Sequence, residues 1–372
     1  MSVAPTRARA EQSPDDATPP IVWRPRRASA AFSILIVDAV AILIFSALSN
    51  FVFLTPQSLS DIALDGSESV LLCVGVAFLL GAGELDISIG ANVILSSVVG
   101  GKAMGAIDDP LFGSLVGALV CAGSGALVGA FNAAIVTRLR VTSFIATLAS
   151  LGIVTGVAYV ITNGYNLSSV PLSLQSDFGV AKLAGVLPYP ALIAVVVALV
   201  ASFALRRTRF GLHTLALGSS REAALRAGVK VRARLTTLFV LAGACAGVCG
   251  FIDLSRYAST NLSGHQTDAL AAIAGAVIGG TSLFGGRISV WGAVFGALLA
   301  VILQDGLVVV GLAAFYQLIA VGIVLIVAVS LREFAGNSDE PTPVFERIRV
   351  LIRGGGKARS DKGGRLPGMR AS

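Results

Sequence analysis

The sequence predicts an all-α fold, a polytopic transmembrane helical bundle, from three observations. Of the 372 residues, 55% are hydrophobic and only 13% are charged, whereas soluble domains carry roughly 25% charged residues. The mean hydropathy is +0.83. Apolar stretches recur from 32 to 331, and each is long enough to cross the hydrocarbon core as a helix of about 20 residues.

About ten spans divide the chain best, within a transmembrane domain over 31–332. Glycine-rich stretches interrupt the apolar pattern near 83–88 and 279–289, and helix breaks are expected there. The expected spans are 32–54, 66–83, 88–106, 111–137, 141–162, 188–206, 236–256, 267–282, 290–311 and 315–331.

Two polar tails flank this domain. Residues 1–30 hold five arginines and few apolar residues, which predicts a disordered tail. Residues 333–372 form a second tail that is rich in basic residues.

Basic residues are distributed unevenly among the connections between the expected spans. One side of the membrane would hold both tails, the long segment 206–235, Arg138, Arg140 and Arg287. The other side would hold only Lys102, Lys182 and Arg256. Because basic loops remain in the cytoplasm, both termini and 206–235 are expected to be cytoplasmic. The net charge of +7 then reflects topology, and no nucleic-acid partner is expected.

The chain lacks the motifs of an embedded enzyme. No G-x-x-x-x-G-K-[ST], H-E-x-x-H or G-x-S-x-G pattern occurs. The two histidines, His213 and His265, are interpreted as solvated loop residues, and the four cysteines lie in apolar runs. We therefore expect no catalytic residue, no metal site and no cofactor bound by this chain.

The stretch GAGELDISIG places two acidic residues between apolar runs. A carboxylate in hydrocarbon costs several kcal/mol, so Glu84 and Asp86 should not face lipid. Gly83 and Gly90 favour a break, and Asp86 with Ser88 can cap the helix that follows. Such breaks also form moving joints or gates in transporters. Whether Glu84 and Asp86 instead contact a solute stays open.

A second break is expected in the stretch GGTSLFGGR. Its glycines allow backbone conformations that other residues avoid. The candidate gating residues here are Gly279, Gly280, Thr281, Gly285 and Gly286.

The segment 206–235 is the only long loop on the basic side. Ser219 and Glu222 have the spacing of a capping box, in which Ser219 would hold the Glu222 amide while Glu222 reaches back. Gly228 suits the position just after a helix. The pattern predicts a helix of about two turns outside the membrane. The alternative is that these basic residues only fix topology and touch lipid headgroups.

Polar residues inside apolar spans are candidates for a solute pathway. Each has an alternative role as a helix–helix hydrogen bond, worth about 0.6 kcal/mol on average. The candidates are Asn92, Asn132, Asn163 and Asp268, followed by Thr147, Thr281, Gln304 and Asp305.

Several motifs together resemble the permease subunits of ribose- and xylose-type sugar ABC importers. GELDISIG resembles that family's G-x-x-D-[LI]-S-[VI]-G segment. TSFIATL and ITNG are similar to its P-F-I-A-T-L and T-N-G elements, and DALAAIAGAVIGGTSLFGGR to a long segment near its end. The matches run in the expected order from about residue 60 to 331. Thr142 stands where proline is usual, and Ile288 where glycine is common.

The resemblance implies that ATP is hydrolysed elsewhere, by a partner ATP-binding subunit that uses ATP and magnesium. It also implies a periplasmic solute-binding protein and a second permease copy, in a homodimer or a paralogous heterodimer, in the bacterial inner membrane lipid. In such permeases the loop corresponding to 206–235 docks on the ATPase. The candidate coupling residues are Thr208, Gly211, Gly218, Glu222, Ala223, Ala224 and Gly228.

The expected function is therefore the permease subunit of an ATP-driven ABC importer for a small hydroxylated solute, foremost a monosaccharide. One alternative is an ABC permease for a nucleoside or a branched-chain amino acid. Another is an ion-coupled secondary transporter with Asp86 and Asp305 as coupling sites. The sequence does not select the solute or the form of the permease dimer.

Overall fold

The computed structural model describes residues 30–168, 170–313, 316, 319 and 322–323. Nearly all of the tails 1–30 and 333–372, and most of the expected span 315–331, lie outside these residues. The all-α class is confirmed. Seven of the described helices are long and apolar enough to cross a membrane: α1 (Ala30–Leu48), α2 (Pro56–Gly81), α4 (Pro110–Arg138), α5 (Ser143–Thr162), α7 (Tyr189–Arg207), α10 (Val231–Tyr257) and α12 (Val290–Val309).

Shorter elements complete the described chain. Two helices in the apolar region, α3 (Ile89–Gly105) and α11 (Asp268–Ile278), follow chain segments that interrupt the helical pattern. Two more, α8 (Arg209–Ser219) and α9 (Arg221–Arg226), lie in the basic loop. The remainder are η2 (Val52–Leu54), α6 (Leu172–Leu174), the π-helical turn η3 (Gln175–Gly179), and the antiparallel pair β1 (Lys182–Leu183) and β2 (Leu187–Pro188).

Some helix ends differ from those expected, for identifiable reasons. Helix α2 begins at Pro56 instead of 66, because the Thr55 side chain accepts a hydrogen bond from the Ser58 amide and Pro56 suits the first turn. Its first two turns therefore carry polar residues. Helix α11 ends at Ile278 instead of 282, because the glycine-rich loop that follows leaves the helical path.

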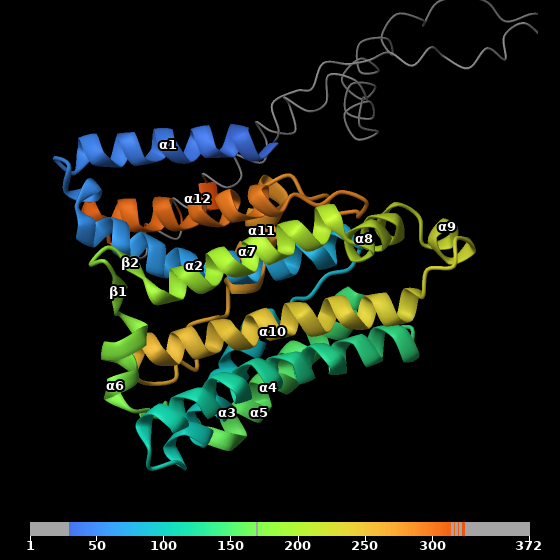
Figure 1. Cartoon of the computed structure of the whole chain (residues 1–372), viewed down its shortest axis with the longest axis horizontal. Coiled ribbons are helices and arrows are strands. Elements are labelled where there is room, and N and C mark those ends of the chain that lie inside the picture. Colours follow the sequence, from blue (N-terminus) through green and yellow to red (C-terminus); the bar gives the residue numbers. More distant parts are fainter. Residues whose placement is uncertain (1–29, 169, 314–315, 317–318, 320–321, 324–372) are drawn as a thin grey trace, which may run out of the picture.

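The helices are arranged in layers that lie side by side (Figure 1). Helix α1 packs along α12, and α10 lies between α2 and α4. The short helices α8 and α9 lie at one end of the bundle, and β1, β2 and α6 lie at the other. Along most of its length α2 is buried, whereas α1, α4, α5 and α7 expose apolar faces. These faces suit contact with lipid.

Glycines allow α4 and α10 to touch backbone to backbone. A Cβ atom added to Gly125 would overlap the carbonyl oxygen of Gly243, and one added to Gly247 would overlap the carbonyl oxygen of Cys121. Small residues drive helix association in lipid because they allow close backbone approach. Close contact at these glycines therefore holds α4 against α10.

Gly125→Leu should weaken this contact, because overpacking of a well-packed site costs about 1–3 kcal/mol. We expect the purified protein in detergent to unfold at a lower temperature. Gly123→Leu on the same helix is the control, because nothing lies within 4 Å of a Cβ added there. Equal melting temperatures for the two variants would contradict the close contact of α4 and α10.

Candidate functional site

Three glycine-rich segments that are far apart in sequence meet at one end of the bundle. The Gly286 amide donates a hydrogen bond to the Gly81 carbonyl, at 2.9 Å. A Cβ on Gly218, near the end of α8, would overlap the Gly81 carbonyl oxygen, and one on Gly285 would lie 2.6 Å from the Gly218 carbonyl oxygen. We call these four residues the glycine junction. It brings both predicted helix breaks against the basic loop.

The first break is held by side chains of α5. After Gly83, whose φ is +78°, the Leu85 amide donates to Ser143 Oγ and the Ile87 amide donates to Thr147 Oγ1, both at 3.1 Å. Backbone groups inside a membrane protein must find such partners in the protein itself. Thr147 therefore stabilises the break, and this accounts for its position in an apolar span.

Asp86 connects the first break to the start of α3 and to α4 through hydrogen bonds. Its Oδ1 accepts hydrogen bonds from the Ser88 amide at 2.9 Å and the Ser88 hydroxyl at 2.6 Å. Asn132 of α4 donates to Asp86 Oδ2 at 3.3 Å and to Ser88 Oγ at 2.8 Å. Asp86 is only 2% exposed. Ser88 is the N-cap residue of α3, but no side chain accepts a hydrogen bond from an amide inside that helix. The predicted capping of α3 by Asp86 and Ser88 is therefore wrong, because the Asp86 carboxylate is occupied by Ser88 itself.

The second break is a compact loop. Thr281 Oγ1 accepts a hydrogen bond from the Ser289 amide at 3.3 Å, and the Arg287 guanidinium donates to the Gly280 carbonyl at 3.2 Å. Gly280, Gly285 and Gly286 all have positive φ. Gly279 lies directly against Gly292 of α12. The residues predicted for this break thus form one closed turn between α11 and α12.

The basic loop contains two helices where one was expected, and its cap is displaced by one residue. Helix α8 continues through Ser219, whose hydroxyl donates to the Leu215 carbonyl. Ser220 is the N-cap of α9 and accepts from the Ala223 amide at 3.2 Å. Glu222 pairs with Arg226 and not with the cap. The predicted Ser219–Glu222 capping box is therefore wrong, because α8 occupies Ser219.

The other candidate coupling residues divide between internal packing and the surface. Thr208 caps α8, and Gly211 lies against the Leu205 backbone, so both shape the turn from α7 to α8. Ala224 is only 2% exposed, and its carbonyl accepts from the Val229 amide. Ala224, although a candidate coupling residue, is therefore covered within the chain and does not present its side chain to a partner. Of the candidates, Glu222, Ala223 and Gly228 are exposed, and Gly228 has the positive φ expected just after a helix.

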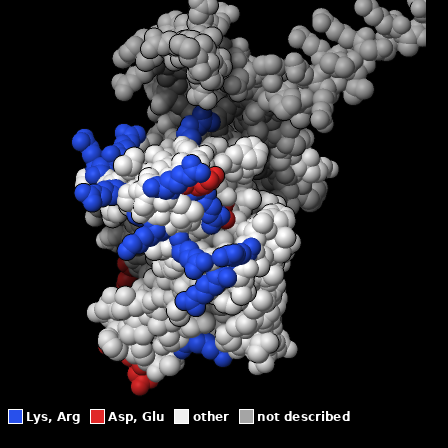
Figure 2. Space-filling model, turned by 90° about the vertical axis from the view of Figure 1, so that its right-hand side faces the viewer, with Lys and Arg blue, Asp and Glu red and all other residues white. Residues whose placement is uncertain are grey.

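An ion pair joins α9 to the first break. Arg221 NH1 lies 3.4 Å from Glu84 Oε1, whose side chain is mostly buried. A cavity of about 690 Å³ lies beside this pair and is lined by residues of the break, of α9 and of the start of α5. Figure 2 shows Lys and Arg side chains gathered over this end of the molecule, with few acidic ones.

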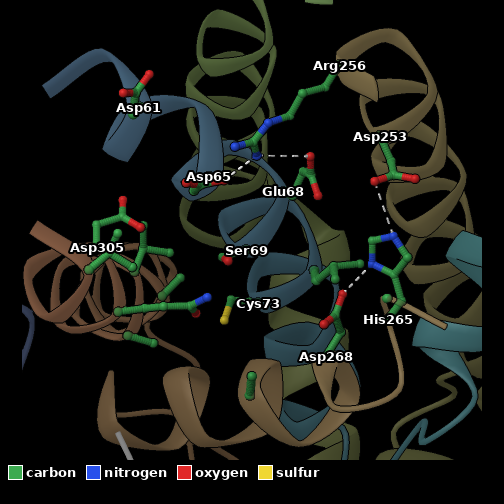
Figure 3. A pocket seen from close by; sticks show the side chains of 18 of the residues that line it. Asp61, Asp65, Glu68, Ser69, Cys73, Asp253, Arg256, His265, Asp268 and Asp305 are labelled. Carbon is green, nitrogen blue, oxygen red and sulfur yellow. Dashed lines mark hydrogen bonds and ion pairs between the residues drawn. The ribbon is translucent and has the colours of Figure 1, made fainter. Parts of the chain in front are cut away.

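The opposite end of the bundle contains a larger cavity of about 780 Å³ between α2, α10, α11 and α12. Arg256 of α10 forms an ion pair with Asp65 of α2 and lies 4.0 Å from Glu68. His265 lies between two carboxylates, 2.7 Å from Asp268 and 3.4 Å from Asp253 (Figure 3). Sequence reasoning missed this cluster, apart from Asp268. The interpretation of His265 as a solvated residue is wrong, because it is 7% exposed.

Of the eight pathway candidates, the structure brings together three, which line the large cavity, and it separates the others. Asp268 lines the large cavity. Asn92 is buried and donates to the Gly125 carbonyl at 3.1 Å, as a helix–helix hydrogen bond. Asn132 belongs to the Asp86 network, and Asn163 ends α5 in an exposed left-handed turn. Gln304 and Asp305 line the same cavity as Asp268.

The His265 cluster should make stability depend on pH. Burial lowers the pKa of His265, but the carboxylates of Asp253 and Asp268 outweigh burial and raise the pKa to about 10. A raised pKa in the folded state stabilises the protein fully below the unfolded value of about 6.5. This stabilisation is lost as the pH rises toward 10. The difference in melting temperature between wild type and His265→Gln should therefore be largest near pH 6 and shrink toward pH 10. Parallel curves over that range would contradict a charged His265.

Comparisons with known proteins agree with the resemblance in the motifs. Residues 58–329 match the family described as the branched-chain amino acid transport system / permease component. The D-allose transport system permease protein AlsC of Escherichia coli K12 is 31% identical over 79% of this chain and 88% of its own length. The L-arabinose ABC transporter permease protein AraH of Azospirillum brasilense is 32% identical over 91% and 98%, respectively.

The ribose import permease protein RbsC of Escherichia coli K12 is 33% identical over 79% of this chain and 91% of its own length. No solved structure matches the chain. The family model covers well over half of the sequence, and seven described helices can cross a membrane. The chain therefore belongs to this family of permease components: it is a multi-pass membrane transport subunit and not an enzyme, and its predicted resemblance to sugar-importer permeases is confirmed.

Proposed function

We propose that the chain is the membrane permease of an ATP-driven importer that moves a small hydroxylated solute, foremost a monosaccharide, into the cytoplasm. The observation that carries the mechanism is the contact of the α8–α9 loop with both helix breaks through Gly218. The solute class rests on relatives whose names specify allose, arabinose and ribose. The family's own description favours one alternative, a branched-chain amino acid.

The basic end supports a cytoplasmic position for α8 and α9, because positively charged loops remain inside. A separate ATP-binding subunit would dock there and would bind the ATP and magnesium. A periplasmic solute-binding protein would deliver the solute to the other end. A second permease copy, identical or paralogous, would complete the membrane part.

In this mechanism α9 receives the movement of the ATPase and passes it to the breaks. Helix α9 is short and rests on the Glu84–Arg221 ion pair at 3.4 Å. Helix α8 is joined to both breaks at the glycine junction, where no side chain separates the backbones. Because packed protein interiors are stiff, a movement of α8 is expected to displace both breaks directly through these backbone contacts.

Ala223→Arg tests the docking role of α9. Ala223 is exposed, so an arginine there leaves the fold intact but adds bulk and charge at an interface, which is costly. We expect the ATP-binding subunit to be lost from the purified complex and solute uptake to fall by at least tenfold. Ala224→Arg is unsuitable, because Ala224 is buried in the chain.

Ser173→Arg is the control for complex formation, because Ser173 is exposed on α6 at the other end of the bundle. That variant should retain the ATP-binding subunit. If Ala223→Arg keeps both an intact complex and normal uptake, α9 is not the coupling element. Uptake that follows an imposed ion gradient without ATP would favour the secondary-transporter alternative.

A further inference from the structure

The cavity at the end opposite α9 is lined by both hydrogen-bond acceptors and hydrogen-bond donors. Three of its carboxylate oxygens have no hydrogen-bond partner in the described part of the chain: Glu68 Oε1, Asp253 Oδ2 and Asp305 Oδ2. Asp253 is the most buried of the three, at 2% exposed. Buried polar atoms in native structures are almost always hydrogen-bonded. These acceptors are therefore available to the donors of a molecule that enters the cavity.

Donors lie beside these acceptors. The Arg256 guanidinium lies between Asp65 and Glu68, and the His265 ring lies between Asp253 and Asp268 (Figure 3). Fixed donors next to free acceptors suit hydroxyl groups, because each hydroxyl both donates and accepts. The volume of about 780 Å³ falls within the range of small-molecule sites, roughly 300–1,000 Å³.

Charge restricts which molecules can bind. Six carboxylates line the cavity, from Asp61, Asp65, Glu68, Asp253, Asp268 and Asp305, against the side chains of Arg256 and His265. An anionic solute would be repelled. A bare metal ion is also disfavoured, because no three metal-binding side chains are grouped to hold one among the described residues. A neutral molecule with several hydroxyl groups remains.

The cavity also contacts the first helix break. A Cβ on Gly90, in the first turn of α3, would overlap the His265 carbonyl oxygen and meet the Asp268 side chain. Gly90 follows directly after the segment that Asp86 and Ser88 fasten. A solute that displaces His265 or Asp268 would therefore press on the start of α3.

We propose that this cavity is a solute-binding site within a single permease subunit, which takes a neutral polyhydroxylated molecule and excludes its anionic derivatives. Asp253 and Glu68 accept hydrogen bonds from its hydroxyl groups, and Arg256 donates to them. This inference rests on the proposed import of a hydroxylated solute and adds a site inside this chain. It is separate from any binding protein.

Saturation-transfer NMR on the purified permease in nanodiscs, without a binding protein, tests the site. The probes are D-ribose, D-allose and L-arabinose, with D-ribose 5-phosphate as the anionic comparison. We expect saturable binding of at least one neutral sugar and at least tenfold weaker binding of the phosphate. Equal binding of the phosphate, or no binding of the neutral sugars, would overturn the proposal.

Two variants locate the binding. Glu68→Gln and Asp253→Asn should each raise the dissociation constant for the bound sugar at least tenfold, with melting temperatures recorded to exclude unfolding. Glu68→Gln is the safer variant, because Arg256 keeps its ion pair with Asp65. Asp177→Asn is the control, an exposed carboxylate of η3 outside the cavity. Unchanged binding in folded Glu68→Gln would place the sugar elsewhere and contradict the assignment.

Uptake by the complete transporter with its binding protein distinguishes this inference from the proposed function. If the wild-type complex imports a neutral sugar but the isolated permease binds none, the cavity proposal fails and the importer proposal stands. If the complex imports none of these sugars, the proposed solute class fails. In that case the cavity proposal stands only if a sugar binds the isolated permease and Glu68→Gln and Asp253→Asn weaken that binding.

Discussion

A backbone that leaves the helical path inside a membrane must find its hydrogen-bond partners within the protein, because hydrocarbon offers none. This constraint explains the surroundings of the first break. Ser143 and Thr147 accept from the amides of residues 85 and 87, and Asp86 binds the amide of Ser88. The polar residues of this region are thus placed where helical hydrogen bonds are missing, and they hold the break in one shape.

The glycine junction follows from the same arrangement. Two breaks and the end of α8 can meet only where side chains do not separate them, and Gly81, Gly218, Gly285 and Gly286 meet this condition. The Gly286–Gly81 hydrogen bond joins the breaks directly. The Glu84–Arg221 ion pair adds a second link, between the first break and α9. The basic loop is therefore connected to the first break both through the glycine junction and through this ion pair.

Local signals in the sequence predicted much of this site, and non-local pairings account for what was missed. Glycine clusters and acidic residues in apolar runs located both breaks, and the basic loop followed from charge asymmetry. The division of the loop into α8 and α9 was missed. Ser219 and Ser220 are both suitable N-cap residues, so the sequence pattern alone does not show which of them begins α9. Sequence reasoning named Asp268, Gln304 and Asp305 of the acidic cavity but missed its ion pairs, because these join distant residues: Arg256 meets Asp65 across 191 positions. His265 has no local sign of burial in the sequence.

Gly218→Ala tests whether the glycine junction couples the α8–α9 loop to the helix breaks. A Cβ at this position would overlap the backbone of Gly81 and Gly286, whereas Gly123→Ala adds the same atom in open space. The measurement is solute uptake per ATP hydrolysed by the reconstituted transporter. We expect that the Gly218→Ala transporter still binds the ATPase but transports far less solute per ATP than the Gly123→Ala transporter. Equal ratios for the two variants would contradict this coupling.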